Sequence, residues 1–218
     1  MPKAKTSLEP QQERSRESLR KLLKAATEVL GQRGVEGTTI PRIAQHAGLT
    51  PGAVYRRFRD KDALLEAAIL GILERQEDRL KSGMTPEMAA KIPLDVFAEQ
   101  IIGAMVVTYR AQAPLLRAFR HFTMGRADTE FIRKAAKLEI RSLERVVDLV
   151  LAGRKEIRHP NARVAVSLGL IMVVSTLYEV VVFPTRGADW KDLVPKDDNA
   201  LKRELTRAFL SYLGVGPG

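Results

Sequence analysis

Hydrogen-bond donors gather in one short stretch of the sequence, where they are suited to bind an anion. Thr50, Tyr55, Arg56 and Arg57 lie between positions 50 and 57. Hydroxyl and guanidinium groups donate hydrogen bonds to phosphate oxygens, and an arginine also donates a bidentate pair to guanine. The residues at 51–53 are small and would let a helix approach a partner closely. The pattern therefore predicts contact with a nucleic acid.

Two short helices with a turn between them are expected to position these side chains. Thr38 or Thr39 is suited to cap the first helix and Thr50 the second, because a threonine hydroxyl accepts from a backbone N–H that a helix start leaves unpaired. Gly48 stands between the two helices, where a left-handed backbone is cheap only for glycine. Two helices joined by a short glycine turn form a helix-turn-helix unit, whose second helix enters the DNA major groove.

The second helix is expected to have one buried and one outward side. Val54 and Phe58 are four residues apart and predict the buried side. Thr50, Ala53, Arg56 and Arg57 are then expected to face mainly outward, with Tyr55 at the edge.

The stretch resembles the DNA-binding domain of the tetracycline-repressor (TetR) family of transcriptional regulators. The likeness rests on Thr39, Ile43, Ala44, Ala47, Gly48, Leu49, Thr50, Gly52, Val54, Tyr55, Phe58, Lys61, Leu64 and Leu65, and upstream on Leu22, Ala25, Ala26, Leu30 and Gly34. It covers residues 15–68, about a quarter of the chain. It implies a homodimer, joined through the last two long helices as a four-helix bundle, that binds an operator in double-stranded DNA. It also implies a small-molecule effector, held in the body of the protein, that shifts the DNA-reading parts.

The resemblance assigns a phosphate contact to Tyr55, whereas Arg57 stands where the family often has histidine. The residues expected to contact DNA are Thr39, Arg42, Thr50, Pro51, Gly52, Ala53, Tyr55, Arg56, Arg57 and Lys61. We expect Arg56 and Arg57 to bind phosphate or guanine, and we expect the others to fix the position of the helix on the phosphate backbone.

Charge and composition favour the same partner. The formal net charge is +10, and residues 1–60 hold 12 Lys and Arg against 6 Asp and Glu, whereas the rest of the chain holds 24 against 20. A basic amino-terminal part on a nearly balanced body is typical of nucleic-acid binding. The chain has no cysteine and only three widely separated histidines. We therefore expect no metal, no cofactor and no catalysis, and the lack of an apolar leader favours the cytoplasm.

Helical periodicity continues to the end of the sequence and predicts an all-α protein. We expect a flexible basic arm at 1–14, the helix-turn-helix domain at 15–61 and a helical body for effector binding and dimerisation at 62–218. The expected helices are 15–30, 61 to about 81, 94–111, 114–124, 128–151, 163–183 and 199–213, with a loop at 82–93.

Residues 163–183 are nearly all apolar and about long enough to span a membrane. A helix that is apolar on all sides is buried somewhere. We expect a buried interface helix, and a membrane-tethered DNA-binding protein is the alternative. An enzyme with a DNA-binding appendage is disfavoured, because no phosphate loop or paired carboxylates are present.

Polar and adaptable side chains among the apolar helices of the body are candidates for an effector pocket. The expected ligand-binding residues are Met105, Tyr109, Arg120, His121, Met124, Met172 and Glu179. Methionine adapts to varied ligands, and a buried carboxylate such as Glu179 would need a partner. Control by a protein partner in place of a small molecule stays open.

Overall fold

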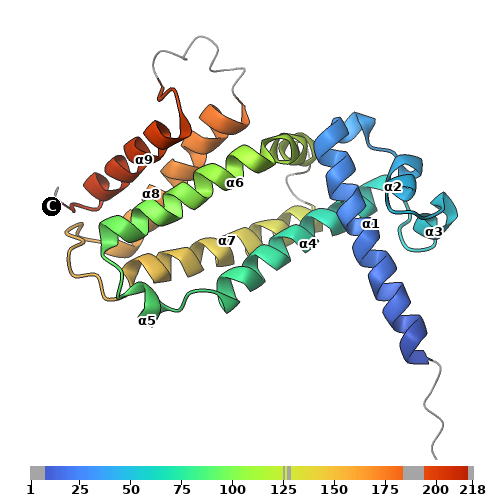
Figure 1. Ribbon diagram of the computed structural model, residues 1–218, viewed down its shortest axis with the longest axis horizontal. Helices are drawn as coiled ribbons and strands as arrows, with labels where there is room; N and C mark the ends of the chain where they lie inside the picture. The colour runs from blue at the N-terminus through green and yellow to red at the C-terminus, as the bar shows by residue number, and fades with distance from the viewer. Residues whose placement is uncertain (1–7, 125, 127–128, 184–193, 216–218) are drawn as a thin grey trace, which may run out of the picture.

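The computed structural model describes residues 8–124, 126, 129–183 and 194–215, and these residues contain helices and no strand, as predicted. The elements are α1 (Leu8–Gly37), α2 (Ile40–His46), α3 (Pro51–Tyr55), α4 (Lys61–Ser82), α5 (Pro86–Ala89), α6 (Leu94–Thr123), α7 (Glu130–Leu151), α8 (Ala162–Leu177), the π-helical turn η1 (Tyr178–Val182) and α9 (Asp198–Tyr212). Helices α1 to α3 and the start of α4 form a head, and the remaining helices form a body (Figure 1).

The head has a small apolar core that the body helps to close. Leu22 and Leu30 of α1, Ile43 of α2 and Val54 of α3 are fully buried there. Phe122 near the end of α6 packs into the same cluster. Helix α4 leaves the head and runs into the body along α7 (Figure 1). The head is therefore joined to the body through both α4 and the end of α6.

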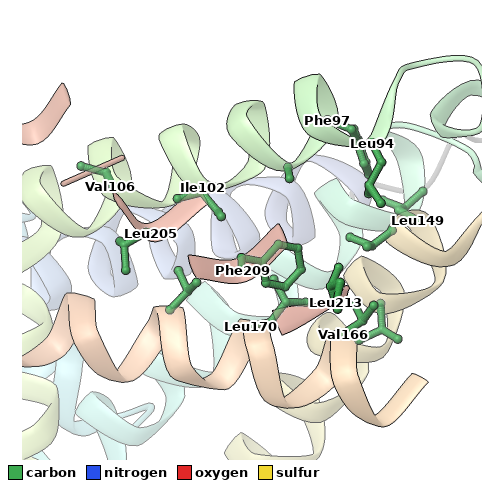
Figure 2. Close-up of a cluster of buried hydrophobic side chains, with 14 of the residues drawn as sticks. Leu94, Phe97, Ile102, Val106, Leu149, Val166, Leu170, Leu205, Phe209 and Leu213 are labelled. Carbon is green, nitrogen blue, oxygen red and sulfur yellow. The ribbon is translucent and has the colours of Figure 1, made fainter. Parts of the chain in front are cut away.

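The body core lies between α6, α7, α8 and α9 (Figure 2). Its labelled side chains are Leu94, Phe97, Ile102, Val106, Leu149, Val166, Leu170, Leu205, Phe209 and Leu213. Helix α8 packs closely on α9, because a Cβ atom on Gly169 would lie 2.8 Å from the ring of Phe209. The small residue at this position allows the two helices to approach.

Helix α1 begins earlier and ends later than the sequence suggested. It starts at Leu8, so the expected flexible arm does not include residues 8–14, and the part at 1–7 lies outside the described residues. Pro10 falls in the first turn, where a missing N–H costs nothing. Near its other end the helix is interrupted at Gly34, whose φ of 65° is left-handed, before it resumes to Gly37.

The two helices expected at 94–111 and 114–124 form the single helix α6, with Pro114 inside it. Proline removes one backbone hydrogen bond and kinks a helix. The last turns of α6 are seen nearly end-on in Figure 1, out of line with the rest. Packing holds the helix together across the proline, because Ala113 is buried and the Cβ of Leu115 would lie 3.5 Å from a Cβ on Gly31 of α1.

Helix α8 and η1 together form the segment, among the described residues, that is long and apolar enough to cross a membrane, with a mean hydropathy of 2.1. Part of this segment, 39% of the most apolar window, is buried in the body. Its other side leaves Val164, Leu168, Ile171 and Met172 between 43% and 53% exposed. These four residues, named the α8 face below, are not covered by any described part of the chain.

Candidate nucleic-acid interface

The helix-turn-helix forms by the local signals that the sequence contains. Thr39 caps α2, and its hydroxyl accepts from the backbone N–H of Arg42 at 3.4 Å. The turn after α2 passes through Gly48, whose φ is 68°. The N–H of Leu49 then donates to the carbonyl of Ala44 at 2.8 Å, which closes the end of α2. These bonds fix the angle at which α3 leaves the turn.

Helix α3 presents the outward side that the sequence predicted. The hydroxyl of Thr50 accepts from the N–H of Ala53 at 3.3 Å, so its own hydrogen remains available to a phosphate. Val54 is fully buried and anchors the helix to the head. Pro51 and Gly52 are exposed, and Tyr55 is 57% exposed.

The two arginines after Tyr55 differ in their surroundings. Arg56 is exposed, and no hydrogen bond or ion pair engages its guanidinium among the described residues. Arg57 is also exposed, but its Nη2 donates to the backbone carbonyl of Ser15 at 3.2 Å and to the Ser15 hydroxyl at 3.0 Å. Arg56 is therefore free to meet an anion, whereas Arg57 is engaged with α1.

Two other residues expected to contact DNA donate hydrogen bonds to the end of α1. Arg42 donates through Nη1 to the carbonyl of Gly37 at 2.7 Å, and Lys61 donates through Nζ to the carbonyl of Val35 at 3.1 Å. Both cations retain further donors. They hold α2 and α4 against α1, so the structure gives them a positioning role whether or not they also reach a phosphate.

The start of α4 is fixed by an aspartate cap. The Oδ1 atom of Asp60 accepts from the N–H of Ala63 at 2.7 Å. This hydrogen bond lowers the pKa of Asp60, because it favours the charged carboxylate. Helices α2, α3 and α4 thus each begin at a side-chain cap, from Thr39, Thr50 and Asp60.

Two half-buried tyrosines meet in the body, close to a carboxylate. The rings of Tyr109 on α6 and Tyr178 on η1 meet edge to face at 5.5 Å. Burial raises the pKa of both phenols, and the nearby Glu139 carboxylate on α7 adds to this effect. Burial also raises the pKa of Glu139, although part of that residue remains in solvent. These three residues, named the tyrosine cluster below, bring α6, α7 and η1 together.

The other expected ligand-binding residues lie in varied surroundings. Met105 packs against the body core, and Met172 belongs to the exposed α8 face. Met124 and Glu179 are exposed, while Arg120 lies near enough to Tyr178 to oppose the rise of its pKa. Of the two hollows described below, one is lined by a single member of the seven, His121, so an effector pocket formed by this set stays a prediction.

His121 lines an open hollow of about 380 Å³ between α1 and α6, with Gly31, Gln32, Gly34, Val35, Pro114, Arg117 and Ala118. A second hollow, of about 160 Å³, lies between α4 and α7 and is lined by Leu70, Glu74, Lys134, Lys137, Leu138 and Arg141. The described residues contain no cluster of His, Asp and Glu that could hold a metal.

Sequence reasoning missed two side chains that the fold makes important. Glu139 completes the tyrosine cluster, and Arg126 donates to Asp62 of α4 at 2.7 Å. Arg126 and Asp62 are 64 positions apart, so no local pattern predicts their contact. For Glu139, the periodicity of α7 gives its place on the helix but not which helix lies opposite.

Comparison with known proteins locates the same domain. The family described as "Bacterial regulatory proteins, tetR family" matches residues 22–68. The HTH-type transcriptional regulator BetI of Escherichia coli O45:K1 is 24% identical over 194 residues, which are 88% of this chain and 91% of that protein. The uncharacterized regulator YerO of Bacillus subtilis is 30% identical over 94 residues, 43% of this chain and 32% of that one.

Solved structures share the fold of the whole chain. A TetR-family regulator from Mesorhizobium loti superposes with a TM-score of 0.69 at 19% identity, over 93% of this chain and 98% of that one. The regulator FadR from Bacillus subtilis, solved in complex with stearoyl-CoA, gives a TM-score of 0.59 at 19% identity, over 88% and 98% of the two chains. The helical body therefore has the same arrangement as theirs.

Proposed function

Because the chain belongs to the TetR family of helix-turn-helix transcriptional regulators, we propose that it is a repressor that binds a palindromic operator as a homodimer. A small molecule bound in the body would release it from the DNA. The observation that carries the proposal is helix α3, which is capped, anchored by buried Val54, and exposes Tyr55 and a free Arg56. Such a surface donates hydrogen bonds to phosphates and base edges and has no catalytic group.

Dimerisation through α8 and α9 is supported by the α8 face. Val164, Leu168 and Ile171 are exposed on a helix whose opposite side is already buried in the body core. Burying apolar area stabilises association by about 25 cal/mol per Å². A second copy of the chain would cover this face in a four-helix bundle, and two heads would then meet the two halves of an inverted repeat.

Effector control would act through the helices that join the tyrosine cluster to the head. Tyr109 of the cluster lies on α6, and α6 also packs on α1 through Leu115. Arg117 of the same helix donates to the carbonyl of Val182 at the end of η1, at 2.7 Å. A ligand that separates Tyr109 from Tyr178 would therefore shift α6 and with it the head. FadR, which shares this fold and was solved in complex with stearoyl-CoA, supports the proposal that a regulator of this fold binds a small molecule.

The proposal is tested by selecting bound sequences from random duplex DNA with the purified protein, without detergent. An enriched inverted repeat is the expected result. Association that depends strongly on salt but enriches no sequence would mean that charge alone holds the DNA, and the repressor assignment would fail. The enriched repeat then serves as the probe in a search for small molecules that lower affinity.

A further inference from the structure

The first turns of α1 make little packing contact with the rest of the head, within the residues that the structure describes. Figure 1 shows this part of the helix running past α2 and α3 and away from the body. Residues 12–17 are all exposed, whereas Leu22 and Ala26 further along the helix are completely buried in the head core. A helical segment without an apolar stripe gains no packing energy. Its contribution to function therefore lies in what its side chains can reach.

The inward side of α1 changes from apolar to polar at the point where it passes α3. Ser15 and Leu22 are seven residues apart, about two turns, and so lie on the same side of the helix. Leu22 packs in the head core, but Ser15 accepts two hydrogen bonds from Arg57, at 3.0 and 3.2 Å. Arg57 follows directly after Arg56, the C-cap of α3. The contact thus fixes the first turns of α1 next to the helix that is proposed to enter the major groove.

Cations without partners flank this contact. Arg14 and Arg16 stand on either side of Ser15 and are exposed, and neither has a hydrogen bond or ion pair within the part of the chain that the structure describes. Their neighbours differ, because Lys21 pairs with Glu17 at 3.0 Å and Lys24 pairs with Glu28 at 3.7 Å. Arg14 and Arg16 are therefore the unpaired guanidiniums that flank the contact between α1 and α3, and they can bind an anion without breaking a bond within the protein.

We propose that the first turns of α1 form a second DNA contact, in which Arg14 and Arg16 bind phosphates that flank the bases facing α3. Arg57 is then a positioning residue that holds α1 in place and does not read a base. The inference rests on the operator binding proposed above. Two observations select DNA as the partner: the surface continues directly from α3, and its free charge is positive. Binding a phosphate with each guanidinium releases condensed counterions, which makes the contact dependent on salt.

The test compares two duplexes that contain the selected inverted repeat. The short duplex ends at the repeat, and the long duplex extends it by about one helical turn on each side. The variants are Arg14→Ala/Arg16→Ala and, as a control that removes the same charge from the body, Arg79→Ala/Lys91→Ala. Specific binding of the short duplex by the wild type tests the operator proposal separately, because that duplex lacks the flanking phosphates.

We expect the wild type and the control to bind the long duplex more tightly than the short one, and the α1 variant to lose this difference. Because a dimer would contribute up to four such arginines, the slope of log K against log salt on the long duplex should decrease in magnitude by about 2–4. An unchanged slope and affinity of the α1 variant on the long duplex would overturn the proposal, as would an equal reduction in affinity on both duplexes.

The positioning role of Arg57 is tested by combining Arg57→Ala with Arg14→Ala/Arg16→Ala. If Arg57 acts only by holding α1, the changes are not additive, and the combined variant binds the long duplex little more weakly than the α1 variant. Arg57→Ala alone should also reduce the salt slope on the long duplex, with an unchanged helical circular dichroism spectrum. Fully additive reductions in affinity would show that Arg57 contacts DNA independently, and this role would be wrong.

Discussion

Arg126 lies between α6 and α7 and binds Asp62 in the first turn of α4, with 2.7 Å between Nη2 and Oδ2. Its guanidinium also lies 3.6 Å from the carboxylate of Glu66 and 4.2 Å from the centre of the Phe122 ring. The two carboxylates belong to the helix that joins head and body, and Phe122 belongs to the helix that carries Tyr109. A single side chain thus connects the end of α6 to the start of α4.

Replacing Arg126 by alanine should weaken this connection. The ion pair is partly exposed and contributes modestly, and the cation–π contact contributes about 0.5–1 kcal/mol. For a chain of this size, a loss of about 1 kcal/mol lowers Tm by about 2–4 °C. Differential scanning calorimetry measures the change. Arg126→Lys keeps the charge but not the planar guanidinium, so its Tm should lie between those of the wild type and Arg126→Ala. An unchanged Tm in Arg126→Ala would contradict the assigned role.

The α8 face should control the oligomeric state. Leu168→Glu places a charge in the proposed interface, where its desolvation opposes association, so we expect a monomer that no longer binds the inverted repeat tightly. Ile140→Glu is the matched control, because Ile140 is 55% exposed on α7 and lies outside the face. Sedimentation velocity of both variants without detergent gives the answer. If Leu168→Glu remains dimeric, the interface lies elsewhere.

Two glycines in long helices should respond in opposite ways to alanine. A Cβ on Gly169 would lie 2.8 Å from the ring of buried Phe209, so Gly169→Ala overpacks the α8–α9 contact and should cost about 1–3 kcal/mol. A Cβ on Gly103 of α6 would meet only the flexible side chain of Lys202 at 3.0 Å. Gly103→Ala should then be neutral or stabilising, by up to about 1 kcal/mol from helix propensity. Chemical denaturation of the two variants compares them directly.

Glu139 should destabilise the protein at neutral pH. Partial burial raises the pKa of Glu139 above its unfolded value, so the charged carboxylate penalises the folded state; the penalty is small, because the residue remains exposed to solvent. Glu139→Gln should therefore raise the free energy of unfolding at pH 7 to 8, and the gain should disappear as the pH falls below the ordinary carboxyl pKa.

Glu130, on the same helix, should have the opposite effect on stability at neutral pH. A hydrogen bond from Lys134 lowers the pKa of Glu130, so this carboxylate stabilises the folded state above its ordinary pKa and loses the effect as the pH falls. Glu130→Gln should reduce stability at neutral pH. Thermal unfolding of both variants from pH 4 to pH 8 compares them, and the same sign of change for the two would contradict the cluster described for Glu139.

The parts of the fold that depend on neighbours in sequence were predictable. The caps at Thr38 or Thr39 and at Thr50, the turn at Gly48 and the inward side at Val54 and Phe58 follow from residue types a few positions apart. The structure confirms them and assigns the first cap to Thr39. The all-α class follows from the period of the apolar residues, because that period is set by the helix itself.

The parts that depend on tertiary packing were not predictable. Pro114 is a helix breaker by its local chemistry, yet the contact of Leu115 with Gly31 of α1 keeps α6 continuous. Arg57 has a side chain suited to a DNA contact. Only the fold shows that Ser15, 42 positions away, accepts its hydrogen bonds. Whether the expected effector residues gather in one pocket depends in the same way on which helix faces meet, so that set stays a prediction.

The central claim, that the outward side of α3 reads a DNA sequence, is tested most directly by one ratio. This is the affinity for the selected repeat divided by the affinity for a scrambled duplex of equal length, at one fixed salt concentration. For the wild type we expect a ratio of about 10³ or more. Arg56→Ala should reduce the ratio, because each bidentate arginine–guanine pair that it removes contributes about 1–3 kcal/mol to the free energy of discrimination. Tyr55→Ala should weaken binding to both duplexes. A wild-type ratio near one would contradict the claim.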